Sequence, residues 1–168
     1  MGRVNEIMSV LKSQRKESQF EVIAHGYRMR RAITDLLLRD FGYKPQKPNE
    51  YETEYQIERR KAFEQWFIVR MRYYVLDTLR RMMREINIAN KIFPTMMREF
   101  EERRIHQDLA LTECFNLLQE LQYAIETLPV DINKLLRFDE MIQRQITLIK
   151  AWRKADNRHK EKLKQGNV

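Results

Sequence analysis

Apolar residues recur every three or four positions along four segments of the sequence, with polar and charged residues between them. That spacing places the apolar side chains on one face of an α-helix. Proline inside a helix loses a hydrogen bond and clashes with the preceding turn, so Pro45, Pro48, Pro94 and Pro129 mark the connections. The pattern predicts four helices, over residues 3–41, 54–91, 95–128 and 131–155.

The apolar stripes predict which side chains form the core. The first segment contributes Val4, Ile7, Met8, Leu11, Phe20, Ile23, Tyr27, Ile33, Leu37 and Phe41. The second contributes Trp66, Met71, Tyr74, Val75, Leu79, Met82, Met83, Ile86 and Ala89. The third contributes Phe100, Ile105, Leu109, Cys114, Leu117, Leu121, Ala124 and Leu128. The fourth contributes Leu135, Phe138, Ile142, Ile146, Ile149 and Trp152.

Residues that cap helices predict where the four helices begin and end. Gly42 is a good stop for the first helix. Thr95 and Glu99 stand where an N-cap and an acidic first turn belong, and Asp131 is a good N-cap for the fourth helix. Residues 12–19 are entirely polar, so the first helix either breaks there or leaves the bundle as a projecting arm.

Short connections between long helices favour antiparallel neighbours. The predicted fold class is therefore all-α, an antiparallel four-helix bundle with long helices. The connection between the third and fourth helices is the tightest, which predicts a helical hairpin there. Residues 1–152 would form the bundle, and residues 153–168, which carry few apolar side chains, would form a basic C-terminal tail.

The composition agrees with long helices joined by few turns. Of 168 residues, 43% are hydrophobic and 33% charged, with only four glycines and four prolines, which is enough for one domain with a real core. No stretch approaches the roughly 20 apolar residues of a membrane span, and the N-terminus lacks the apolar segment of a signal peptide. The single cysteine suits a reducing compartment, so a cytoplasmic location is expected.

Nothing in the sequence has the pattern of an enzyme or a metal site. A di-iron bundle needs glutamate three residues before histidine, and none of His25, His106 and His159 has it. Cys114 lies on the apolar stripe of the third helix, where a small buried hydrophobe is expected. Because the four glycines are isolated, there is no phosphate-binding loop. We expect a protein without catalytic residues, metal or cofactor.

The charge is strongly positive and unevenly distributed. The formal net charge is +8, while residues 105–133 contain no lysine or arginine. Such a balance favours an anionic partner, although salt bridges and surface solvation explain basic clusters equally well. The candidate nucleic-acid-binding residues are Arg28, Arg30, Arg31, Arg80, Arg81, Arg84, Arg153, Lys154, Arg158 and Lys160.

Aromatic residues among the basic clusters and apolar residues away from the main stripes raise two further possibilities. Tyr27, Trp66, Tyr73, Tyr74 and Trp152 lie among the clusters and could stack on unpaired bases, although most fall on core stripes. Apolar residues away from the main stripes predict a homo-oligomer. They are Leu36, Leu38, Phe67, Ile68, Leu111, Phe115 and Tyr123.

Three phrases in the C-terminal third resemble a known family. They are LLQELQ at 117–122, LPVDINK at 128–134 and LIKAWRKADNR at 148–158. This part of the chain resembles the accessory variability determinant of diversity-generating retroelements. The resemblance implies a basic four-helix bundle that forms a pentameric ring. It also implies that the chain partners a reverse transcriptase and its template RNA during mutagenic cDNA synthesis.

The leading hypothesis is a non-catalytic accessory protein that binds RNA and a reverse transcriptase and supports template-directed cDNA synthesis. The alternative is a protein-only helical adaptor or structural oligomer whose charge maintains solubility. A small DNA-binding regulator is disfavoured, because the helices are too long and the turns contain proline.

Overall fold

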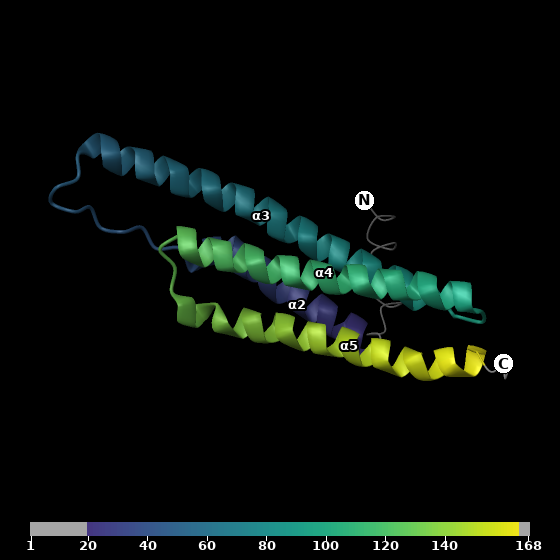
Figure 1. Ribbon diagram of the computed structural model, residues 1–168. Coiled ribbons are helices and arrows are strands. Elements are labelled where there is room, and N and C mark those ends of the chain that lie inside the picture. Colours follow the sequence, from purple (N-terminus) through teal and green to yellow (C-terminus); the bar gives the residue numbers. More distant parts are fainter. Residues whose placement is uncertain (1–19, 165–168) are drawn as a thin grey trace, which may run out of the picture.

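The computed structural model describes residues 20–164, and all regular structure within that range is helical (Figure 1). The main helices are α2 (Glu21–Leu38), α3 (Glu54–Lys91), α4 (Met97–Thr127) and α5 (Leu136–Lys164). Two short 3-10 turns, Asp40–Gly42 and Ile132–Lys134, precede α3 and α5. The all-helical fold class is thus confirmed. The polar residues 12–19, with their predicted break or arm, lie outside the described residues.

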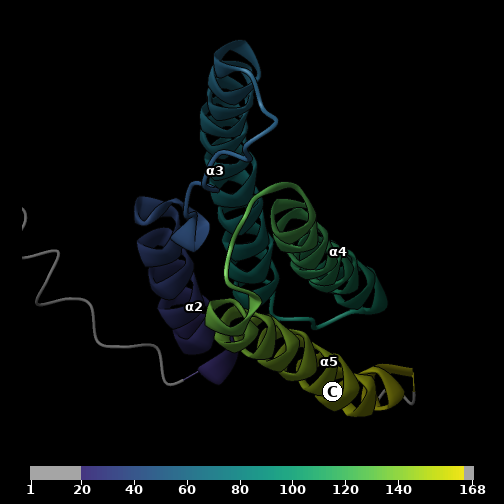
Figure 2. The same ribbon diagram turned by 90° about the vertical axis from the view of Figure 1, so that its left-hand side faces the viewer.

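The four helices pack in the cyclic order α2, α3, α4, α5, and α2 closes the ring against α5 (Figure 2). Consecutive helices run in opposite directions, as the colours along the chain show (Figure 1). The packing of four long helices against one another agrees with the sequence prediction. The N-terminal end of α3 projects beyond the other helices (Figure 1). We call residues 54–63 the α3 overhang, and none of its side chains is buried.

The core contains the stripes of all four helices, with corrections on α2, α3 and α4. Phe67 and Ile68 of α3 are buried, whereas Trp66 and Tyr74, predicted in the core, are exposed. On α4, Ile105 and Leu109 are likewise exposed, and on α2 so is Tyr27. The largest fully buried side chains come from every helix. They include Met29, Ile33, Met71, Leu79, Met82, Leu117, Phe138 and Ile142.

The turn after α2 is left-handed for three consecutive residues. Asp40, Phe41 and Gly42 have φ angles of 52°, 60° and 76°. The helix therefore ends at Leu38, earlier than the predicted end at 41, and Gly42 closes the turn rather than the helix. Burial of Phe41 and an ion pair between Arg72 and Asp40 hold this conformation, which non-glycine residues adopt only at a cost.

The predicted starts of α4 and α5 also differ from the structure. Met96 is the N-cap of α4, and the Glu99 carboxylate instead accepts hydrogen bonds from the backbone and hydroxyl of Thr95, at 2.7 and 2.8 Å. Asp131 accepts from the Asn133 amide at 3.1 Å and caps a 3-10 turn, so α5 begins at Leu136. Only α3 has the predicted bounds, and a capping box of Thr53 with Gln56 fixes its start.

Candidate nucleic-acid interface

The predicted basic tail is helical as far as Lys164, because α5 packs against the first turns of α4 through polar side chains. Asp156 is the centre of this α4–α5 polar seam. Arg103 donates to Asp156 at 3.0 Å, and Gln107 donates to it at 2.7 Å. The Arg103 guanidinium also lies 4.9 Å from the centre of the Trp152 ring. These contacts replace the apolar stripe that the sequence lacks after Trp152.

The α4–α5 polar seam divides the four candidate residues of α5 into two pairs. Arg153 and Lys160 face α4: Arg153 forms an ion pair with Asp108 at 2.9 Å, and the Lys160 ammonium lies 5.3 Å from the Phe100 ring centre. Lys154 and Arg158 are exposed. Arg153 therefore does not share a face with them, although the helical spacing of residues 153, 154 and 158 allows all three side chains to lie on one face.

Lys154 and Arg158 belong to a row of three cations whose third member, Lys162, is not among the candidate residues predicted from the sequence. Lys162 follows at the same spacing of four residues, so all three side chains lie on one solvent-exposed face of α5. We call these three residues the α5 basic ridge. Within residues 20–164 none of them forms an ion pair, whereas Lys164 is paired with Glu161 at 3.6 Å. Lys154 and Arg158 are thus members of the predicted site that no carboxylate of the described residues neutralises.

The candidate arginines of α3 form ion pairs with carboxylates of the protein itself. Arg80 is paired with Asp77 at 2.7 Å, and Arg81 joins Asp77 to Glu113 of α4. The hydrogen bonds to Glu113 raise the pKa of Arg81 above its usual value. Arg84 is exposed and lies 3.6 Å from Glu85. Arg81 is therefore a tie between two helices rather than a free phosphate ligand.

The candidate arginines of α2 lie on a separate helix and differ in their pairing. Arg28 forms an ion pair with Glu21 at 2.6 Å, and Arg144 of α5 shares that carboxylate at 3.3 Å. Arg30 and Arg31 are exposed, and neither has an ion pair within the described part of the chain. Two of these three residues remain open to an anionic ligand.

The structure exposes an aromatic surface on α3 that sequence reasoning placed mostly in the core. Trp66 is 56% exposed, Tyr73 64% and Tyr74 47%, because α3 turns Phe67 and Ile68 inward instead. Exposed arginines alternate with the rings at spacings of three or four residues. We call this surface the α3 aromatic–arginine stripe: Tyr55, Arg59, Phe63, Trp66, Arg70, Tyr73 and Tyr74.

A groove of about 370 Å³ between α3 and α4 borders the α3 aromatic–arginine stripe. Trp66, Arg70 and Tyr74 line it from α3, and Glu120 and Tyr123 line it from α4. The Arg70 guanidinium lies 5.9 Å from the centre of the Trp66 ring. The sequence signal for this surface is the presence of arginines among aromatic residues at spacings of three or four. The same spacing also fits a core stripe, so the sequence pattern alone is ambiguous.

The three histidines and the cysteine have structural partners. His25 lies 2.7 Å from Gln145, His106 lies 2.6 Å from Glu85, and His159 lies 2.5 Å from the Pro94 carbonyl. Cys114 is buried as predicted, and burial raises the pKa of its thiol to about 12. Among residues 20–164, no group of three or more histidine, cysteine, aspartate or glutamate side chains is placed to hold a metal ion.

Comparison of the chain with protein-family models, with curated proteins and with solved structures found no match. None of the helices in the described range combines the length and the apolarity needed to cross a membrane.

Proposed function

We propose that this chain is a non-catalytic accessory protein that binds RNA on an antiparallel four-helix bundle. Its partner would be a reverse transcriptase, which it would assist in template-directed cDNA synthesis. The partner follows from the resemblance of segments 117–122, 128–134 and 148–158 to the accessory variability determinant. The observation that supports RNA binding is the α5 basic ridge, whose cations have no anionic partner among the described residues.

The α5 basic ridge carries a small energetic cost that an anionic ligand would relieve. Like charges four residues apart destabilise a helix by about 0.2–0.5 kcal/mol per pair, and the ridge contains two such pairs. Lys162 lies in the last turn of α5, where the helix dipole favours a cation, so this member of the ridge also has a structural role. A phosphate backbone would neutralise all three side chains at once and release its condensed counterions.

A triple substitution tests this role of the ridge. Replacing Lys154, Arg158 and Lys162 with glutamine removes up to three phosphate contacts, so the slope of log affinity against log salt should flatten by about 2 units. Binding of a structured RNA, measured by fluorescence anisotropy at several salt concentrations, gives this slope. The fold should persist, because all three side chains are exposed.

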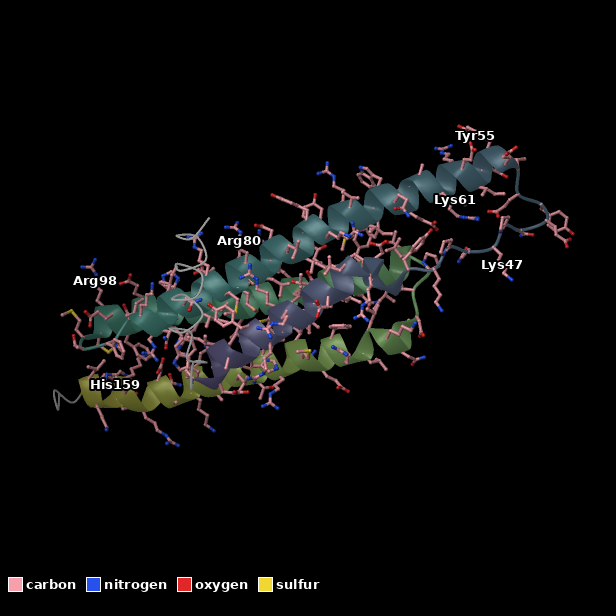
Figure 3. The ribbon with its side chains drawn as sticks, turned by 180° about the vertical axis from the view of Figure 1, so that it is seen from behind. Lys47, Tyr55, Lys61, Arg80, Arg98 and His159 are labelled. Carbon is pink, nitrogen blue, oxygen red and sulfur yellow. The ribbon has the colours of Figure 1, made fainter. Side chains whose placement is uncertain are left out.

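The matched control removes the same charge elsewhere. Lys44, Lys47 and Lys61 are exposed and lie in the connection before α3 and in the α3 overhang (Figure 3). Their replacement with glutamine should leave most of the affinity and the salt slope intact. Equal losses in both triple variants would mean that net charge alone attracts RNA. If the unmodified protein binds no RNA at low salt, the protein-only adaptor becomes the better description.

The adaptor alternative has its own supporting observation. Ile105, Leu109 and Phe115 of α4 are exposed, in the part of the chain that contains no lysine or arginine. An apolar surface of this kind suits a protein partner, either the reverse transcriptase or a second copy of the chain. Co-purification with a co-expressed reverse transcriptase of a diversity-generating retroelement tests the first of these. Loss of co-purification after RNase treatment would show that the two proteins associate only through shared RNA.

A further inference from the structure

The α3 aromatic–arginine stripe has the chemistry of a surface that binds unpaired nucleotides. Residues 55–74 span roughly 28 Å at 1.5 Å per residue. Trp66 and Tyr73 are more than half exposed, and Arg59 and Arg70 stand between rings along the same face. Figure 3 shows Tyr55, the first residue of the stripe, on the side of α3 that points away from the other helices.

The charge of the stripe favours a polyanion over a second copy of the chain. The stripe contains two arginines and no carboxylate, and the next acidic residue on this face, Asp77, is already paired with Arg80 and Arg81. Two copies that met through the same stripe would bring Arg59 and Arg70 against like charges. A phosphate backbone would instead pair with both guanidinium groups while its bases stack on the rings.

We propose that the α3 aromatic–arginine stripe binds a single-stranded stretch of RNA. The bases stack on Trp66 and on Tyr73 or Tyr74, and Arg59 and Arg70 contact the phosphates. This inference rests on the proposed RNA-binding function and specifies its ligand, because paired bases in a duplex cannot stack on side chains. Stacking on aromatic rings tolerates any base, so the stripe confers no strong sequence preference.

Tryptophan fluorescence tests the stacking directly. The chain has two tryptophans, of which Trp66 is 56% exposed and Trp152 only 7%. An oligouridylate of about ten nucleotides, which forms no duplex, should quench the emission of Trp66 when a base stacks on it. In a Trp66→Phe variant only buried Trp152 emits, so the quenching should disappear, while the phenylalanine ring preserves most of the affinity.

Affinity measurements separate this inference from the proposed function. Trp66→Leu combined with Tyr73→Leu should weaken oligouridylate binding at least about tenfold and leave the affinity for a blunt RNA duplex unchanged. Val69→Ala with Leu76→Ala, which removes two exposed apolar side chains from another side of α3, should change neither. The glutamine variant of the α5 basic ridge should keep the quenching at saturation.

Three results would overturn the inference. Unchanged oligouridylate affinity in the double leucine variant, with binding lost in the ridge variant, would refute the stripe and retain the proposed function. Trp66 emission typical of a buried indole, together with a lower mass in the double leucine variant, would show that a second copy covers the stripe. No RNA binding by the unmodified protein would refute both proposals.

Discussion

His25 shows how a single buried side chain makes the fold sensitive to pH. Its Nδ1 lies 2.7 Å from the amide oxygen of Gln145, and Gln145 in turn donates to the Val22 carbonyl at 2.9 Å. Because an amide oxygen only accepts, Nδ1 carries the proton of a neutral imidazole. Burial lowers the pKa of His25 below 6.5, and the positive charges of Arg144 and Arg28 act in the same direction.

Stability should therefore fall as the pH falls. The folded state disfavours the charged imidazole, so the unfolded state binds the proton more readily, and the stabilisation present above pH 6.5 is lost below it. Urea unfolding at pH 7.5 and 5.5 should show a smaller difference for a His25→Gln variant than for the unmodified protein. A His159→Gln variant, which leaves His25 in place, should keep its larger difference. Equal pH dependence in both variants would contradict this account.

Individual side chains also show where the sequence pattern is ambiguous. Residues 66, 67 and 68 of α3 are Trp, Phe and Ile, and a helix can bury two of these neighbours but not all three. Helical spacing alone predicts that Trp66 and Tyr74 lie in the core, whereas the structure buries Phe67 and Ile68. The Phe67 ring packs against the Tyr123 ring, with the ring centres 5.1 Å apart. This contact favours the burial of Phe67, and it joins residues that are far apart in sequence.

Among the helices, α5 depends most on contacts that no periodicity reveals. The bounds of α3 were predictable because a capping residue and flanking prolines act locally. The C-terminal part of α5 was not, since its support comes from polar side chains of α4, which the sequence places 49 to 53 residues away. The same contacts decide which cations of α5 face solvent, so the candidate site could be predicted only in part.

Removing the central carboxylate of the α4–α5 polar seam tests its contribution. Asp156→Ala leaves Arg103, whose side chain is only 14% exposed, without its anionic partner. Loss of a charge-assisted hydrogen bond of this kind costs about 1.5–3 kcal/mol, which urea unfolding would measure. Glu161→Ala removes a carboxylate whose one ion-pair partner within residues 20–164 is exposed Lys164, and it should cost less than about 0.5 kcal/mol. Similar losses in the two variants would mean that the seam does not hold α5.

At the scale of the whole molecule, the exposed apolar side chains of α4 bear on assembly. We expect a homo-oligomer in solution, because Ile105, Leu109 and Phe115 are exposed apolar side chains on a helix that lacks cations from residue 105 onward. Light scattering at micromolar concentration should give a multiple of 20.6 kDa. Leu109→Glu with Phe115→Glu should reduce the mass towards that of one chain. A mass of 20.6 kDa for the unmodified protein would exclude self-association.

The α3 overhang has a consequence for the local stability of the fold. No other helix covers its side chains, so its helical turns depend on the Thr53 capping box and on ties to the preceding connection. Those ties are the Arg60–Glu52 ion pair and, one residue beyond the overhang, the hydrogen bond from the Tyr43 hydroxyl to Glu64, at 2.5 Å. Short helical segments without tertiary packing are marginal in water. The local unfolding of the overhang therefore costs less free energy than that of the rest of α3. Part of the binding free energy of any ligand bound there is used to keep these turns helical.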